Sequence, residues 1–217
     1  MNANTKQNFQ LGTCTVPCGR NERWLIDEFD ISRNDAILFN LRPIRDGAGY
    51  QTVNPGRFKR LSRVTHGTHL GRDRVYYTVV MSNTPMEVRT NFDPFLEATG
   101  RVLINGLGMG MVLEAILSKP DVTHVRVIEI DQLLIDLVGP HFAHDPRVEI
   151  ICADAMTYKP ERGARFDYAW HDIWDNICED NLPEMAALSR KYRNPIAKLQ
   201  GFWCRDEIRR EARRYRR

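Results

Sequence analysis

The sequence contains no hydrophobic run long enough to span a membrane, and residues 1–8 are polar instead of forming a signal-peptide pattern. Its five cysteines are an odd number and are scattered, which does not fit a disulfide framework in a chain of 217 residues. We therefore expect a soluble cytoplasmic protein without a membrane partner.

The sequence also lacks a complete set of metal ligands. Cys14 and Cys18 are separated by three residues, but no histidine or third cysteine lies near them. Zinc sites use four such ligands or three and a water. We therefore interpret the two residues as ordinary thiols and predict no metal site.

Positive charge is concentrated at the C-terminal end. The formal net charge is +3, and residues 205–217 contain seven arginines and three acidic residues, so the rest of the chain is close to neutral. Composition predicts a basic helix over 205–217. This helix could dock nucleic acid, or it could cover a sheet edge or a second subunit of a homo-oligomer, and we favour the structural role.

A glycine-rich turn dominates the middle of the chain. The apolar residues 102–104 are followed by Gly106, Gly108 and Gly110, and then by apolar residues with helical spacing from Met111. The pattern predicts a strand, a tight turn and a helix, which is typical of a ligand-binding turn in an open α/β sheet. Met111 stands where the dinucleotide fingerprint has its third glycine or alanine, which argues against a nicotinamide or flavin cofactor.

Strands and helices are expected to alternate around this turn. The predicted strands after it cover residues 124–130, 147–153, 166–172 and 196–203. Alternation of this kind requires a parallel sheet with right-handed crossovers. The expected fold is therefore α/β, a Rossmann-like doubly wound and mostly parallel sheet of about five strands spanning residues 83–204.

Residues 1–82 have a different character. Residues 1 to about 20 are polar and predict a loose lead-in, whereas β-rich runs at 24–31, 36–39 and 75–80 are separated by turn residues at 46–47, 54–56 and 69–71. We expect a small N-terminal antiparallel β appendage. The basic residues within 57–63 are interpreted as a solvated strand face and not as a nucleic-acid patch. Thr84, Pro85 and Glu87 then form the pattern of a capping-box helix start.

Acidic residues follow three of the parallel strands. Glu129, Asp154 and Asp172 stand at strand ends, and carboxyl ends of strands in an open sheet line one crevice. Glu129 is placed to accept hydrogen bonds from ribose hydroxyls, about twenty residues after the glycine turn. Asp154 either contacts an adenine amino group or caps a turn.

Asp172 and Asp175 are the candidate catalytic residues, because a strand-end carboxylate can orient an acceptor amine and take its proton. Strand alternation turns His171 to the opposite face, so we predict a core or surface histidine. Trp170, Trp174 and Trp203 could line an acceptor pocket or belong to the core.

Taken together, these segments resemble the class I S-adenosylmethionine-dependent methyltransferases, and within them the spermidine-synthase-like branch. The matching segments are residues 102–110, 127–131, 145–149, 153–155 and 166–175. The resemblance implies S-adenosylmethionine as cofactor. It implies that Gly106, Gly108 and Gly110 hold its methionine and ribose part, that Glu129 holds the ribose, that Ile130 packs near the adenine, and that Asp154 with Ala155 meets the adenine edge.

The sequence departs from that branch at three points. Met109 replaces an aspartate that holds a cationic aminopropyl chain, residues 173, 174 and 176 differ after the fourth strand, and the usual sixth and seventh strands look absent. Acceptor residues must then come from the β appendage, the C-terminal tail or a second subunit.

These departures lead us to predict an S-adenosylmethionine-dependent methyltransferase with an unidentified acceptor. An aminopropyltransferase and a non-catalytic cofactor-binding or interaction protein are the alternatives. The chain lacks the Asn/Asp-Pro-Pro-aromatic run of enzymes that methylate base amino groups. Nucleic acid is therefore not favoured as the substrate.

Overall fold

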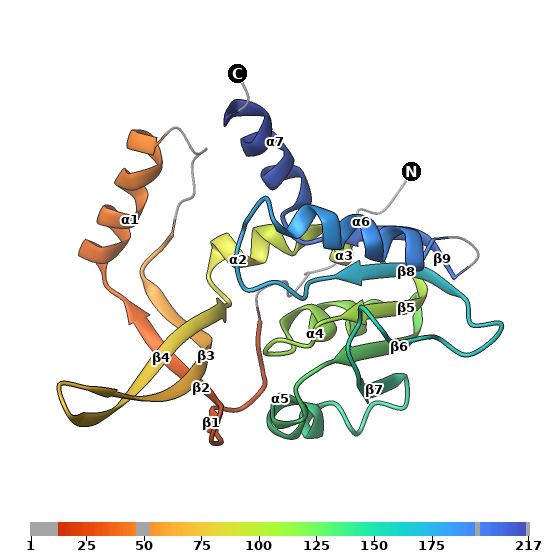
Figure 1. The fold of residues 1–217 in the computed structure, drawn as a ribbon, viewed down its shortest axis with the longest axis horizontal. Helices are drawn as coiled ribbons and strands as arrows, with labels where there is room; N and C mark the ends of the chain where they lie inside the picture. Colours follow the sequence, from red (N-terminus) through yellow and green to blue (C-terminus); the bar gives the residue numbers. More distant parts are fainter. Residues whose placement is uncertain (1–12, 47–52, 194–195, 216–217) are drawn as a thin grey trace, which may run out of the picture.

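The computed structural model describes residues 13–46, 53–193 and 196–215. These residues form two sheets with helices around them (Figure 1). The first is a four-stranded antiparallel sheet with the order β1-β2-β3-β4, and the second is a five-stranded parallel sheet with the order β7-β6-β5-β8-β9. The expected α/β fold with an antiparallel N-terminal sheet is confirmed. No helix among the described residues is long and apolar enough to cross a membrane.

The antiparallel sheet comes first in the chain. Its strands are β1 (Gly19–Arg20), β2 (Trp24–Ile31), β3 (Gly56–His69) and β4 (Arg72–Ser82). Leu70 and Gly71, both with positive φ, form the turn of a long β3–β4 hairpin, as the turn residues at 69–71 predict. Basic side chains of β3 are paired with acidic side chains of β2, for example Arg60 with Asp27 at 2.8 Å.

The strand predicted at residues 36–39 is wrong, because these residues lie inside helix α1 (Arg33–Asp46). Ser32 and Asp35 start this helix: the Ser32 hydroxyl donates to the Asp35 carboxylate at 2.6 Å and accepts from the Asp35 amide at 3.1 Å. Ala36 then packs against Ile31. Residue 47 of the turn predicted at 46–47 lies outside the described residues.

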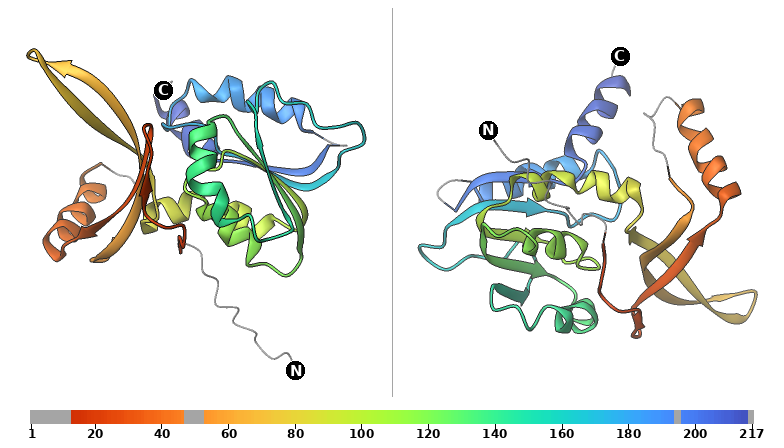
Figure 2. Two further views of the ribbon diagram at one scale, coloured as in Figure 1. Left: turned by 90° about the horizontal axis from the view of Figure 1, so that it is seen from below. Right: turned by 180° about the vertical axis from the view of Figure 1, so that it is seen from behind.

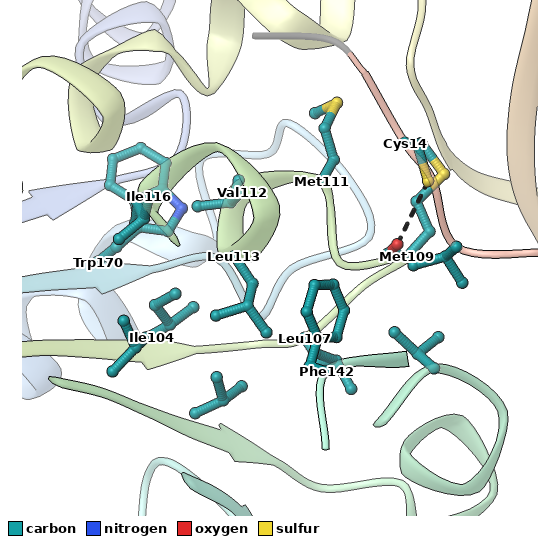
Figure 3. Packing of buried hydrophobic residues seen from close by; sticks show 14 of the residues in the cluster. Cys14, Ile104, Leu107, Met109, Met111, Val112, Leu113, Ile116, Phe142 and Trp170 are labelled. Atoms are coloured by element: carbon teal, nitrogen blue, oxygen red, sulfur yellow. Dashed lines mark hydrogen bonds between the residues drawn. The ribbon is translucent and has the colours of Figure 1, made fainter. Parts of the chain in front are cut away.

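The loose lead-in is wrong for residues 13–20, and residues 1–12 lie outside the described part. Cys14 and Val16 are buried in the main hydrophobic cluster. Figure 3 shows the Cys14 thiol, which donates to the Met109 carbonyl at 3.5 Å. This segment therefore lies against the glycine turn of the parallel sheet.

The parallel sheet is built around a buried central strand. Its strands are β5 (Gly100–Asn105), β6 (Val122–Glu129), β7 (Val148–Cys152), β8 (Phe166–His171) and β9 (Ala197–Phe202). Val102 and Ile104 of β5 face one hydrophobic cluster, whereas Leu103 faces another. Helices therefore cover both faces, as in a doubly wound sheet.

Six helices among the described residues surround this sheet. They are α2 (Pro85–Thr90), α3 (Phe92–Glu97), α4 (Met111–Leu117), α5 (Gln132–Val138), α6 (Asn181–Lys191) and α7 (Arg205–Tyr215), with a short 3₁₀ turn at Gly139–His141. Helix α2 begins at Pro85 as predicted, but the Thr84 side chain makes no capping hydrogen bond, so the capping box does not form. Figure 2 shows from two further directions that α1 and the antiparallel sheet lie to one side of the parallel sheet.

Candidate functional site

A cavity of about 930 Å³ lies where the carboxyl ends of the parallel strands face the antiparallel sheet. The structure brings together eight of the predicted site residues along its wall. These are Gly106, Gly108, Glu129, Ile130, Asp154, Ala155, Asp172 and Asp175. Gly110 does not line the cavity. It precedes α4 with positive φ, and a side chain there would collide with the ring of Phe142.

The glycine turn is shaped by close approaches of other segments. Gly106 has a φ of 99°, and a Cβ atom there would collide with the backbone carbonyl of Asp172. Gly108 has a φ of 54°, and a Cβ atom would collide with the thioether sulfur of Met81 from β4. Both positions therefore favour glycine for their positive φ, and at Gly106 the approaching backbone also leaves no space for a side chain.

Glu129 connects the glycine turn to helix α5. Its side chain is 7% exposed and accepts hydrogen bonds from the Leu107 and Asp131 amides, both at 2.9 Å. Burial raises its pKa, while these backbone donors act in the opposite direction. A carboxylate has about four acceptor positions, so the Glu129 carboxylate retains positions for ligand hydroxyls.

Ile130 and the segment of Asp154 form the neighbouring wall. Ile130 is 68% exposed, so it offers a free apolar surface to a flat ring. One oxygen of Asp154 accepts from the Met156 amide at 2.7 Å, so this side chain caps its own turn while lining the cavity. The carbonyl of Ala155 accepts from the Tyr192 hydroxyl at 3.1 Å. An adenine contact by Asp154 stays a prediction.

Asp172 follows β8, and its amide donates to the Asn105 carbonyl at 2.9 Å. Burial raises the pKa of Asp172 well above its usual range, and the nearby carboxylates of Glu87 and Asp175 raise it further. Burial likewise raises the pKa of Glu87 to about 7, although Asn91 donates a hydrogen bond that acts against this shift. No ion pair is found for Glu87 or Asp172 among the described residues.

Sequence reasoning missed Glu87 as a cavity residue, because its position in the chain suggested only a helix cap. It also missed Arg63, because this residue belongs to a string of basic strand residues. An Nη2 atom of Arg63 lies 2.7 Å from Asp175 Oδ2, and the guanidinium lies 5.2 Å from the ring centroid of Trp24. Arg63 and Trp24 both line the cavity.

The antiparallel sheet therefore forms part of the cavity wall. Arg23 lies 3.0 Å from Asp131, and the Trp24 indole N–H donates to the same carboxylate, also at 3.0 Å. These contacts attach β2 to the loop that follows Glu129. The N-terminal β appendage, one of the three alternatives that the sequence left open, thus contributes residues to the cavity wall, while their role toward an acceptor stays a prediction.

Met109 and His171 lie away from the cavity. Met109 is fully buried, and Figure 3 shows it packed beside Cys14 in the hydrophobic cluster. His171 is fully buried between Asn105 and Gln200 and stacks on Phe202 at 4.5 Å. His171 is therefore a core histidine, one of the two alternatives, core or surface, that the sequence left open, and burial lowers its pKa to about 3.

Trp170, Trp174 and Trp203 all line the cavity. The sequence left open whether they line a pocket or belong to the core. Trp170 and Trp203 are also buried in the core, so the two alternatives are not exclusive. Among the described residues, no cluster of three or more His, Cys, Asp or Glu side chains could hold a metal ion.

In the parallel sheet, a glycine turn follows the central strand and acidic residues follow the neighbouring strands. This arrangement defines a class I S-adenosylmethionine-dependent methyltransferase-like fold, which is the fold of a superfamily of S-adenosylmethionine-dependent transferases. No protein-family model matches the chain.

Among curated proteins, the chain is similar to polyamine aminopropyltransferases. It is 29% identical to polyamine aminopropyltransferase 2 of Ralstonia nicotianae, with 52% of this chain and 27% of that protein covered. It is 27% identical to the polyamine aminopropyltransferase of Hamiltonella defensa, with 59% and 43% covered. The chain therefore spans less than half the length of these two relatives.

Solved structures that resemble the chain include both methyltransferases and spermidine synthases. The 23S rRNA methyltransferase ErmE has a TM-score of 0.40 and 20% identity, with 52% of this chain and 43% of that chain covered. Spermidine synthase from Thermotoga maritima has a TM-score of 0.36 and 19% identity, with 54% and 49% covered.

Proposed function

We propose that this protein binds an S-adenosyl sulfonium cofactor and transfers an alkyl group from it to an amine acceptor. The supporting observation is that one cavity joins the glycine turn, the buried carboxylate of Glu129 and the strand-end carboxylate of Asp172. These residues come from three parallel strands, whose carboxyl ends are the usual place for ligands in an open α/β sheet.

The nucleoside half of the cofactor fits the wall that follows β6 and β7. Glu129 would accept hydrogen bonds from the ribose hydroxyls, because both its oxygens are held in place by backbone amides. Ile130 would pack on the adenine, and Asp154 with Ala155 would meet its edge. Gly106 and Gly108 would leave room for the chain that carries the sulfonium.

A bound sulfonium would supply an electron-poor carbon: the acceptor nitrogen would form the new C–N bond in line as the C–S bond breaks, and a neutral thioether would leave. Such a reaction depends mainly on positioning of the acceptor, and on a group that takes its proton. Asp172 is placed for both tasks. Its raised pKa makes the ionised carboxylate of Asp172 a stronger base than an ordinary carboxylate. Asp175, which is paired with Arg63, would form part of the acceptor wall of the same cavity.

Aminopropyl transfer is the first candidate for the reaction. It is supported by the similarity to polyamine aminopropyltransferases and by the carboxylates of Glu87 and Asp172, which suit a cationic ligand. Methyl transfer from intact S-adenosylmethionine is the second candidate. It is supported by the sequence of the glycine turn at 106–110, which contains no acidic residue that could pair with an aminopropyl ammonium group.

Competition calorimetry with S-adenosylmethionine and its decarboxylated form tests this proposal. Tighter binding of the decarboxylated form supports aminopropyl transfer, and tighter binding of the intact form supports methyl transfer. Mass spectrometry of an incubation with amines then distinguishes an enzyme from a non-catalytic cofactor-binding protein. Absence of binding to either form would overturn the whole proposal.

Glu129→Ala should weaken binding of both forms about ten- to a hundredfold, because paired charged hydrogen bonds to ribose hydroxyls would be lost. Asp136→Ala is the matched control. Asp136 is an exposed residue of α5, and it does not line the cavity. Equal affinities for the two variants would contradict the role of Glu129.

A further inference from the structure

The ion pair between Arg63 and Asp175 lies in the wall of the cavity. Arg63 reaches the cavity from β3, and its Nη2 atom lies 2.7 Å from Asp175 Oδ2. The guanidinium also stacks over Trp24, which is itself buried against the core. Arg63 is therefore held from two sides, by a carboxylate in the segment that follows β8 and by an indole of β2.

On the acceptor side of the cavity, this arrangement leaves the carboxylates of Glu87 and Asp172 to bind a cation, while Asp180, an exposed residue, also lines the cavity. Asp175 is neutralised by Arg63, whereas no cation is paired with Glu87 or Asp172 in the part of the chain that the structure describes. Glu87 and Asp172 are close enough for the charge of Glu87 to raise the pKa of Asp172. Together they can hold one ammonium group.

A second ammonium group on the acceptor would meet a different environment. If it extended toward Asp175, it would face the guanidinium of Arg63, and like charges in a partly desolvated site repel each other. An uncharged end would instead lie against Trp174 or Trp24, which line the same cavity. The pocket therefore discriminates by the number of charges on the acceptor.

We propose that Arg63 is a specificity-determining residue that restricts the acceptor to amines with a single ammonium group. The inference rests on the proposed function, because it assigns Asp172 and Asp175 to the acceptor side of the cofactor. It concerns the charge of the acceptor and is independent of whether an aminopropyl or a methyl group is transferred.

The test compares 1-aminobutane with 1,4-diaminobutane, which have the same carbon chain and differ in the second ammonium group. Calorimetry would measure each amine with the full chain saturated by 5′-methylthioadenosine or S-adenosylhomocysteine. The wild-type protein should bind the monoamine more tightly. Arg63→Gln should free Asp175 and raise the affinity for the diamine about fivefold relative to the monoamine, as expected for a partly exposed charge pair.

Arg60→Gln is the matched control. Arg60 lies on the same strand and is paired with Asp27, but it does not line the cavity. Its variant should keep the wild-type preference. Asp175→Asn serves as a second variant in case Arg63→Gln does not fold, because it leaves Arg63 unpaired and should weaken diamine binding further.

The outcomes separate this inference from the proposed function. If the protein binds neither nucleoside, the proposed function fails and the inference fails with it. If it binds a nucleoside but prefers the diamine, or binds neither amine, Arg63 does not have the proposed role. An amine preference that is the same in the Arg63→Gln and Arg60→Gln proteins would also overturn the inference, as would undiminished diamine binding by Asp175→Asn.

Discussion

Glu87 and Asp172 are carboxylates placed where ionisation is unfavourable. Both line the cavity, and the pKa of each is raised by burial. A folded protein keeps such groups at a cost to its stability, since water solvates a carboxylate better than a cavity wall does. A cationic ligand in the cavity would offset this cost, because it would neutralise the negative charge of the two carboxylates.

The pH dependence of stability tests this view of Glu87. Its pKa is raised to about 7, so the folded state binds the proton more firmly than the unfolded state. Stability from this group is fully present below its ordinary pKa and is lost as the pH rises through about 7. Between pH 5 and pH 8, the ligand-free protein should lose about 1–3 kcal/mol of unfolding free energy through Glu87.

Glu87→Gln should remove this part of the pH dependence. Urea unfolding at pH 5 and pH 8 measures it for both proteins. The pKa of Asp172 is raised as well, so some dependence of the unfolding free energy on pH should remain in the variant. Identical slopes for the two proteins would show that Glu87 ionises as an ordinary exposed glutamate.

Helix α7 combines a basic surface with a buried stripe. Ile208 is 2% exposed and packs in the second hydrophobic cluster with Leu188 and Phe202. Two of its arginines are paired within the helix, Arg209 with Asp206 and Arg210 with Glu207. Part of the positive charge is therefore compensated locally. These contacts agree with the structural role that we favour, while nucleic-acid binding and homo-oligomer formation stay predictions.

Ile208→Ala should lower the unfolding free energy by about 2–5 kcal/mol, because it removes buried methyl groups and leaves a cavity. Arg209→Ala, on the exposed side of the same helix, should change it by less than about 0.5 kcal/mol. Urea unfolding measures both. A neutral Ile208→Ala variant, together with salt-sensitive nucleic-acid binding that is lost when residues 205–217 are deleted, would favour the alternative role.

Contacts around Trp24 help to join the two sheets. Its ring is buried in the main hydrophobic cluster and its indole N–H donates to Asp131, while the Asn21 amide group donates to the Leu133 carbonyl at 2.7 Å. Trp24 also lines the cavity. The stability of the molecule and the shape of its cavity therefore depend on the same residue.

Trp24→Ala should cost about 3–5 kcal/mol of unfolding free energy and should weaken cofactor binding, because the two sheets lose a shared hydrophobic contact. Circular dichroism during urea unfolding and calorimetry with the cofactor measure the two effects. Tyr76→Ala, at an exposed position of β4, serves as the control and should be nearly neutral. Loss of stability without any change in cofactor affinity would show that the antiparallel sheet does not support the site.

The parallel sheet was predictable from the sequence because its signals are local. Apolar runs, three alternate glycines and acidic strand ends each depend on fewer than ten neighbouring residues, and the glycine turn needs positive φ whatever surrounds it. The same locality explains the candidate site, since parallel strands bring their carboxyl ends to one edge. Helix α1 was also encoded locally, by Ser32 and Asp35, although the apolar run at 36–39 suggested a strand.

Only the tertiary structure decided how the antiparallel sheet meets this edge. The pairing of Arg63 with Asp175, the entry of Met81 beside Gly108 and the burial of Cys14 against Met109 each join residues far apart in the chain. From the sequence, Arg63 is one basic strand residue among several, and Glu87 belongs to a helix-start pattern. Their place in the cavity depends on the packing of two sheets, and packing of this kind leaves no periodic pattern in the sequence because it arises from single contacts between distant segments.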